Sequence, residues 1–278
     1  MSNQTLLPDE VIIVASGDNI ENVIQQYRSK LNIKYIYSEE AGQIHQRNIG
    51  KSKLNNNTDF VVILDDDVLL APNAMEKIMD YWETKDNNTA GIGFNLISSN
   101  DHPDFESSYV NNFYKAKRGM VTSSGFGVPI NNLTNNKQTQ WLGGGYSTWR
   151  FNVINEFEQV PINTKWAQGE DIRFSYPISK KYELHVCANA HAYVMEYDNE
   201  NIKNVIYKSK TTALSKIYFT TLHPELSTIR AFSYLLIKMI INLISFKRIK
   251  IGIGQLQALY IFIKSKLNSK DLLFYLNE

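Results

Sequence analysis

The chain has one cysteine, Cys187, among 278 residues, so no internal disulfide can form. The first ten residues, MSNQTLLPDE, lack both the basic start and the apolar core of a secretory signal. Disulfides stabilise mainly the proteins of oxidising compartments. These two absences together predict a cytoplasmic protein.

Long uncharged hydrophobic runs are also absent. The most apolar stretch, Ile229–Gly254, is interrupted by Arg230 and Lys238, and it lacks the roughly 18 to 20 uncharged residues of a membrane-spanning helix. Hydrophobic residues make up 43% of the chain, which is enough for one substantial core with a smaller appendage. We expect a main domain over 1–200 and a helical region over 201–278.

Acidic residues are scarce in that second part. Between Lys203 and Lys266 there are eleven Lys or Arg residues and one acid, Glu225, a net +10 that leaves −9 elsewhere in a chain of net +1. Two interpretations stay open: a basic, apolar helix peripheral on an anionic membrane surface, or a helical subdomain packed on the main core with solvated lysines. No RNA or DNA motif accompanies the charges, so we do not expect nucleic acid as a partner.

Short apolar runs alternate with helical patterns in the N-terminal part of the chain. The runs EVIIVAS, IKYIYS and FVVILDDD predict strands at 10–16, 33–38 and 60–67. The patterns NIENVIQQYRSK, GQIHQRNIGKSK and PNAMEKIMDYWETK predict helices at 19–30, 42–53 and 72–85. This alternation indicates an α/β fold with a mostly parallel sheet and helices on both faces.

Three carboxylates, Asp65, Asp66 and Asp67, follow the third predicted strand. Helix capping would explain them, but the next helix is predicted to start at Pro72, a favoured first position, after the apolar Val68–Ala71. In open α/β sheets ligands bind beyond the carboxyl ends of strands. Adjacent carboxylates repel unless a cation compensates them, and oxygen ligands suit Mg²⁺ or Mn²⁺. We therefore expect a divalent ion and a bound diphosphate here.

A second acidic pair, Glu170 and Asp171, follows Gly169 and opens a helical pattern. Acids are ordinary at a helix N-terminus because they complement the helix dipole. A carboxylate held apart from a metal can also act as a general base toward a hydroxyl. Both interpretations stay open on the residues alone.

Three glycines, Gly143–Gly145, stand between the acidic clusters. They let a backbone approach a ligand closely, or they form a flexible turn before a helix that we expect to start at Thr148. The neighbouring Trp141, Tyr146 and Trp149 offer flat apolar faces on which sugar rings stack, or they belong to the core.

In this order the motifs resemble those of the family 2 glycosyltransferases, which have the GT-A fold. The similarity runs from about Thr5 to about Tyr197. It rests on the segments LLPDEVIIVASGD, AGQIHQRNIGKSK, FVVILDDDVLLAPNAMEKI, GGGYSTWRFNVI and GEDIRFSYPISKKYEL. The resemblance implies a metal-dependent, inverting transfer of a sugar from a nucleotide-diphosphate donor to a hydroxyl of a glycan or lipid-linked acceptor, in surface polysaccharide synthesis.

The resemblance also implies where the donor binds. Asp65, Asp66, Arg47 and Gly42 would lie near the nucleotide, and Asp67 would bind the metal, Mg²⁺ or Mn²⁺. The metal would stabilise the departing nucleoside diphosphate.

For the transfer itself, the resemblance implies that Asp171 is the general base and that Glu170 orients it or contacts the acceptor. The backbone of Gly144 and Gly145 would lie near the sugar, with Trp141 beside it. One carboxylate suffices, because a metal-bound diphosphate leaves without a protonating acid.

The sequence departs from the family pattern at three places. It begins at the far end of the family's first helix, so one strand and one helix are missing. Ala15 and Ser16 replace an acidic pair after the family's second strand, which leaves Ser16 or Asp18 as the nucleotide contact. The late histidine that many members place near the metal corresponds to His191.

The missing unit has three explanations that stay open: a misassigned start or fragmentary gene, a pocket completed by another chain, or a degenerate protein. A sheet without a central strand exposes unpaired backbone and apolar surface. This predicts poor solubility or self-association.

Two other classes of function fit parts of the sequence. VVILDDDV also suits a haloacid-dehalogenase-like phosphohydrolase with Asp65 as nucleophile and Asp67 as acid, although the later Ser/Thr and lysine motifs of that class are not found. A non-catalytic nucleotide-binding or scaffold protein at a membrane is favoured by the missing unit and the basic tail. The retained Asp67 and Asp171 argue against it.

Overall fold

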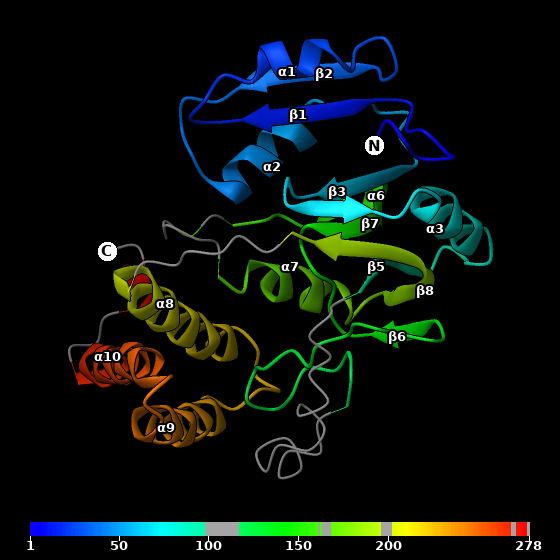
Figure 1. The fold of residues 1–278 in the computed structure, drawn as a ribbon. Coiled ribbons are helices and arrows are strands. Elements are labelled where there is room, and N and C mark those ends of the chain that lie inside the picture. Colours follow the sequence, from blue (N-terminus) through cyan, green and yellow to red (C-terminus); the bar gives the residue numbers. More distant parts are fainter. Residues whose placement is uncertain (98–116, 161, 163–167, 196–201, 268–270, 277–278) are drawn as a thin grey trace. The chain divides into compact units, whose positions relative to one another are not determined.

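The computed structural model describes residues 1–97, 117–160, 162, 168–195, 202–267 and 271–276 (Figure 1). These residues form two compact units. The first unit contains 1–97, 130–160 and 170–195, and the second contains 117–129, 162, 168–169, 202–267 and 271–276. Most of the second unit therefore lies beyond the expected boundary at residue 200, and the rest comes from earlier in the chain.

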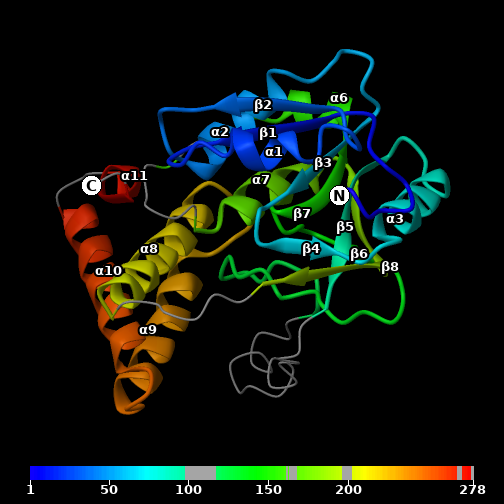
Figure 2. The same cartoon turned by 45° about the horizontal axis from the view of Figure 1, so that its top comes forward.

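The main sheet of the first unit has the strand order β3–β7–β5–β8–β4, with β6 also paired to β8 (Figures 1 and 2). Its strands are β3 Phe60–Leu64, β4 Val68–Leu70, β5 Thr89–Leu96, β6 Lys137–Thr139, β7 Tyr146–Arg150 and β8 Glu183–Val194. Strands β5 and β8 pair in parallel, whereas β7 returns between β3 and β5 and is antiparallel to both, and β4 and β6 are antiparallel to β8. The α/β class is confirmed, but the main sheet is mixed rather than mostly parallel because returning strands are inserted.

A separate two-stranded sheet precedes it. Strands β1 Val11–Ala15 and β2 Ile33–Tyr37 pair in parallel, with helix α1 Glu21–Gln25 between them and α2 Gln43–Lys51 after them. Helix α1 is shorter than predicted, and Ile24 is its one buried residue. Within the described residues β1 and β3 each pair with one strand, so the sheet that we expected to be continuous is in two pieces.

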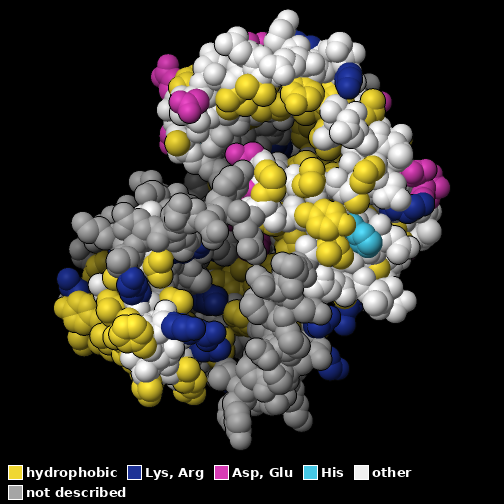
Figure 3. All heavy atoms as spheres, in the orientation of Figure 1, with side chains coloured by type: hydrophobic (Ala, Val, Ile, Leu, Met, Phe, Trp, Pro, Cys, Tyr) yellow, Lys and Arg dark blue, Asp and Glu magenta, His cyan; other side chains and the backbone are white. Residues whose placement is uncertain are grey.

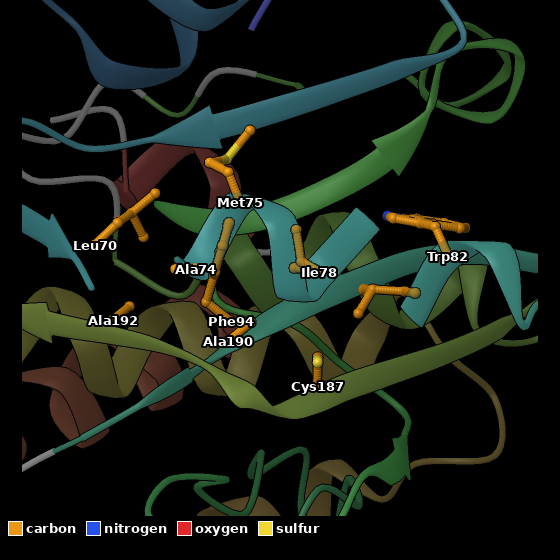
Figure 4. Close-up of a cluster of buried hydrophobic side chains, with 10 residues drawn as sticks. Leu70, Ala74, Met75, Ile78, Trp82, Phe94, Cys187, Ala190 and Ala192 are labelled. Atoms are coloured by element: carbon orange, nitrogen blue, oxygen red, sulfur yellow. The ribbon is translucent and has the colours of Figure 1, made fainter. Parts of the chain in front are cut away.

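Both faces of the main sheet are covered, as predicted. On one face α3 Ala74–Glu83 buries Met75 and Ile78 against Phe94 of β5 (Figure 4). The side chains of β3 alternate between that cluster and a second one, to which α6 Phe151–Glu156 and α7 Glu170–Ile178 contribute. This alternation places the two clusters on opposite faces of the sheet.

Helix α3 starts at Ala74 and not at Pro72. The residues before it continue the sheet, because Val68–Leu70 pair with β8 and the Ala71 N–H donates to the His191 carbonyl at 3.0 Å. A whole strand therefore separates the three aspartates from α3. Helix capping does not account for them, as the sequence indicated.

The second unit is helical, with α8 Ile202–Thr221, α9 Thr228–Ile244, α10 Ile249–Leu267 and α11 Leu272–Leu276. Its helices share one buried cluster that includes Leu214, Ile217 and Leu235. Gly254 allows α10 to approach α8 closely, since a Cβ there would lie 2.8 Å from the Cβ of Ser209. Within the described residues, no helix combines the length and the apolarity needed to cross a membrane.

Candidate active site

Arg47 joins the two acidic clusters of the first unit. From helix α2 its Nη2 donates to Asp65 Oδ1 at 2.8 Å, and its Nη1 donates to Glu170 Oε1 at 3.0 Å. Asp65 follows strand β3 and Glu170 opens helix α7, and they lie 18 and 123 positions from Arg47 in the sequence. The fold thus brings together acids that the sequence placed in two separate motifs.

This bridge is largely buried, since 11% of the Arg47 side chain and 9% of the Glu170 side chain are exposed. Burial alone would lower the pKa of Arg47, but the charges of Glu170 and Asp65 outweigh it and raise the pKa above its usual value. When one partner of a buried ion pair is removed, the other is left as an uncompensated buried charge. The bridge therefore fixes the spacing of the two clusters.

Gln43 completes the surroundings of Asp65. Its Nε2 donates to Asp65 Oδ2 at 2.9 Å, so both carboxylate oxygens of Asp65 accept a bond from helix α2. Gln43 and Arg47 stand four residues apart and lie on the same helix face. Sequence reasoning missed Gln43, although this spacing from the selected arginine could have identified it.

The glycine run lies against this bridge. A Cβ on Gly144 would lie 2.6 Å from Glu170 Oε1 and 2.8 Å from Arg47 Nη1, and a Cβ on Gly145 would collide with the Asp65 carboxylate. The Asp65 N–H donates to the Gly145 carbonyl at 2.9 Å. Glycine is required here because the backbone fills the space beside the charged groups. That Gly144 and Gly145 lie near a sugar stays a prediction.

The helix expected at Thr148 is wrong. Tyr146–Arg150 form strand β7 between β3 and β5, and helix α6 begins at Phe151. Ser147, Thr148 and Trp149 are fully buried in the sheet. β-branched and aromatic residues fit a pleated, buried surface, and this preference overrides the glycine-then-helix pattern.

Glu170 and Asp171 are neighbouring carboxylates, of which Glu170 is buried and Asp171 is partly buried. Burial raises the pKa of Asp171, and the Ile172 N–H, which donates to Asp171 Oδ1 at 2.8 Å, opposes that rise. Burial also raises the pKa of Glu170, against the opposing charge of Arg47. Within the described residues Glu170 Oε2 is buried and accepts no hydrogen bond. That oxygen is available to a hydroxyl donor.

Tyr146 belongs to this site as well. Burial, followed by the charges of Asp171, Asp65 and Glu170, raises the pKa of its hydroxyl above the usual value. The phenol therefore stays protonated beside three carboxylates and can donate a hydrogen bond. The sequence singled out Tyr146 as an aromatic face and not as a hydrogen-bond donor.

Asp67 lies between β3 and β4, where its carbonyl accepts the Met195 N–H at 2.8 Å. Burial, and then the charges of Asp65 and Asp66, raise the pKa of its carboxyl. No three His, Cys, Asp or Glu side chains in the described part of the chain gather into a metal site of their own. One carboxylate completed by water and phosphate oxygens is a usual site for Mg²⁺. The donor set therefore fits a divalent ion that shares its ligands with a diphosphate.

His191 lies at the far end of the same strand pairing. Its carbonyl accepts the Ala71 N–H, whereas the Asp67 carbonyl accepts from Met195, four residues after His191 and just past the end of β8. At about 3.3 Å per residue this separates the two backbones by roughly 13 Å. The backbones of His191 and Asp67 thus lie apart, and a metal-binding role for His191 stays a prediction.

The remaining selected residues take various places. Ser16 directly follows β1, Gly42 precedes the first residue of α2, and Asp66 is exposed beside the bridge. Trp141 is partly buried after β6, and its carbonyl accepts the Thr139 hydroxyl at 2.9 Å. Trp149 packs on Phe174 in the core, with ring centroids 5.1 Å apart, and is not at the site.

Comparisons with known proteins show the family and the fold of the chain. The family model described as glycosyl transferase family 2 matches residues 1–140. No curated protein matches the chain.

Solved structures with a similar fold include the following three. GalNAc-T7 with UDP, GalNAc and Mn²⁺ is 14% identical, with a TM-score of 0.53 over 81% of this chain and 47% of its own. The 1–349 segment of S. aureus TarS is 13% identical, with a TM-score of 0.53 over 95% and 85%. A mannosyltransferase from Pyrobaculum calidifontis in complex with GDP-Man and Mn²⁺ is 12% identical, with a TM-score of 0.54 over 95% and 80%. The chain thus spans less than half of the first of these proteins, and the likenesses show the fold, which is GT-A.

Proposed function

The chain belongs to glycosyl transferase family 2, and we propose that it is an enzyme that transfers a sugar from a nucleotide-diphosphate donor to a hydroxyl acceptor. The observation that carries this proposal is the Arg47 bridge, which holds the acids after β3 at a fixed spacing from the acids of α7. A transferase needs these two groups together, because one serves the departing diphosphate and the other serves the attacking hydroxyl.

The donor side of the site is the loop after β3. Asp67 would hold Mg²⁺ or Mn²⁺, and Asp66, Arg47, Ser16 and Gly42 would lie near the nucleotide. Two of the similar solved structures contain UDP or GDP-Man together with Mn²⁺, which supports a nucleotide sugar as donor and a divalent ion. When bound, the ion supplies the positive charge that stabilises the leaving diphosphate.

The acceptor side is the start of helix α7. Asp171 takes the proton from the acceptor hydroxyl, whose oxygen forms a bond to the anomeric carbon as the bond from that carbon to the diphosphate oxygen breaks. A single displacement of this kind inverts the anomeric configuration. The buried environment that raises the pKa of Asp171 makes the carboxylate a stronger base than an exposed one.

Glu170 and Tyr146 orient the acceptor. Glu170 Oε2, buried and without a hydrogen bond in the described part of the chain, accepts from an acceptor hydroxyl, and the protonated Tyr146 donates to one. Trp141 and the backbone of Gly144 and Gly145 face the sugar. A glycan or lipid-linked acceptor in surface polysaccharide synthesis matches this set of hydroxyl partners.

The phosphohydrolase alternative is set aside. It would require Asp65 as a nucleophile, but both oxygens of Asp65 are held by Arg47 and Gln43. The family match also points to a transferase.

The test compares Asp171→Asn with Asp59→Asn, an exposed aspartate next to the same strand β3. UDP-, GDP- and dTDP-sugars are screened for sugar transfer or donor hydrolysis, and donor binding is measured in parallel. Asp171→Asn should lower turnover at least about 100-fold with donor binding retained, because a general base contributes roughly 10² to 10⁴ in rate. Turnover near the parental rate in Asp171→Asn would refute the assignment of the base. A folded parental protein that binds a donor and turns over none would support the non-catalytic alternative.

A further inference from the structure

The turn between α9 and α10 of the second unit exposes apolar side chains beside basic ones. Phe246 is 94% exposed and Ile244 is 81% exposed. Lys247 and Arg248, the next two residues, are exposed as well. Large apolar side chains that are this exposed to solvent do not contribute to the hydrophobic core of the unit.

Exposed apolar side chains also line the two helices that the turn connects. Helix α9 buries Ala231, Leu235 and Met239, and it exposes on its opposite side Ile229, Leu236, Ile237, Ile240, Ile241 and Ile244. Helix α10 buries Gly252, Ala258 and Leu259, and it exposes Ile249, Leu256, Tyr260, Ile263 and Leu267 at spacings of three, four and seven residues. Each helix is thus apolar on the face it packs and also on the face it turns outward.

The segment that contains these two helices carries no carboxylate of its own. From Leu226 to Lys270 the sequence has eight Lys or Arg and no Asp or Glu. Figure 3 shows hydrophobic and basic side chains intermixed over these helices. Burial, and then the charge of Arg248, lowers the pKa of Lys238, as expected where like charges gather without acids.

We propose that the α9–α10 turn, Ile244–Ile249, inserts into the surface of a bilayer that contains anionic lipids. Phe246 and Ile244 enter the boundary between headgroups and acyl chains, while Lys247 and Arg248 bind phosphate groups of anionic headgroups. The outward apolar faces of α9 and α10 lie next to the turn and extend the contact. Amphipathic segments with aromatic and Leu or Ile residues on one side and Lys or Arg beside them bind membranes in this way.

Charge distinguishes a lipid surface from the other candidate partners. A second copy would place two acid-free, basic surfaces against each other in a two-fold interface, and their like charges would repel. A nucleic acid would satisfy the lysines but would leave Phe246 and the isoleucines in water. An anionic bilayer matches both the charge and the apolar surface. The inference does not depend on the proposed catalytic activity.

The experiment is sedimentation of the full chain with vesicles of phosphatidylcholine alone, or with about 30% phosphatidylglycerol. Binding should need the anionic lipid and should weaken at about 0.5 M NaCl. Ile244→Ser with Phe246→Ser should weaken binding at least about tenfold. Lys247→Ala with Arg248→Ala should weaken it roughly 30-fold, the equivalent of about 1 kcal/mol per charge.

Matched controls lie in the first unit. Val160→Ser removes an apolar side chain that is 64% exposed, and Lys30→Ala with Lys34→Ala removes two exposed charges. Neither should change binding by more than about twofold.

Three results would overturn the proposal. One is no sedimentation with either vesicle, and another is equal losses in the controls and in the turn variants. The third is a protein that does not sediment with vesicles and instead forms a concentration-dependent dimer, which Phe246→Ser dissociates. That result would show that a second copy of the chain covers this surface.

Discussion

Arg47 and Lys216 are both partly buried cations, one in each unit, and their surroundings affect their pKa values in opposite ways. Two carboxylates raise the pKa of Arg47 against its burial. Burial, followed by the charge of Lys238, lowers the pKa of Lys216 to about 8, and its Nζ lies 4.4 Å from the ring centroid of Phe126. The cost of burial is thus offset by two carboxylates around Arg47, whereas around Lys216 it lowers the pKa.

This difference between the surroundings of Arg47 and Lys216 indicates what kind of function each unit is suited to. In the first unit the acids and Arg47 fix one another, which is how a site keeps its geometry before a substrate arrives. In the second unit the segment from Leu226 to Lys270 contains basic residues and no Asp or Glu. Such a surface is suited to a negatively charged partner from outside the chain.

The largest expected effect is the loss of Arg47. Arg47→Met leaves Asp65 and Glu170 uncompensated, so the free energy of unfolding should fall by about 3–5 kcal/mol, measured by urea denaturation. Lys77→Met is the control, because its pair with Asp80 is exposed, with 40% and 59% of the two side chains in solvent. That variant should change the free energy by less than about 1 kcal/mol. Equal effects would mean that the bridge does not stabilise the site.

Gly145→Ala tests how closely the backbone packs on the bridge. Its Cβ would collide with Asp65, so we expect a loss of about 1–3 kcal/mol in stability and at least about tenfold weaker nucleotide binding. Gly50→Ala in helix α2 is the control, since the nearest atom to its Cβ, Val14 Cγ2, is 3.6 Å away. The control should be neutral or slightly stabilising because alanine favours a helix. Normal binding by Gly145→Ala would contradict the described packing.

Lys216→Met tests the other side of the comparison and has the smallest expected effect. The unfolded chain holds the Lys216 proton more tightly than the folded one, so between about pH 8 and 10.5 this group makes the wild type more stable as the pH rises. Lys216→Met should therefore be more stable than the wild type at pH 7 and should lack this part of the pH dependence. Thermal unfolding at several pH values measures both, with the exposed Lys264→Met as the control.

The sequence predicted the elements that carry the site better than the contacts within it. Asp65–Asp67 at a strand end and Glu170 at a helix start were both recognised from local patterns, because burial and helix polarity leave local signals. The Arg47 bridge left none, since its partners lie 18 and 123 positions away. Strand β7 was missed for a related reason, because pairing with β3 and β5 sets the conformation of Thr148.

The most direct test of the central claim is calorimetric titration of the chain with UDP, GDP and dTDP, with and without Mn²⁺, in wild type and Asp67→Ala. The account predicts that one nucleotide binds in the presence of Mn²⁺ and that Asp67→Ala removes the metal-dependent part. Folded protein that binds none of them, or binds one equally well with Asp67→Ala, would contradict the assignment of the acidic loop as the donor site.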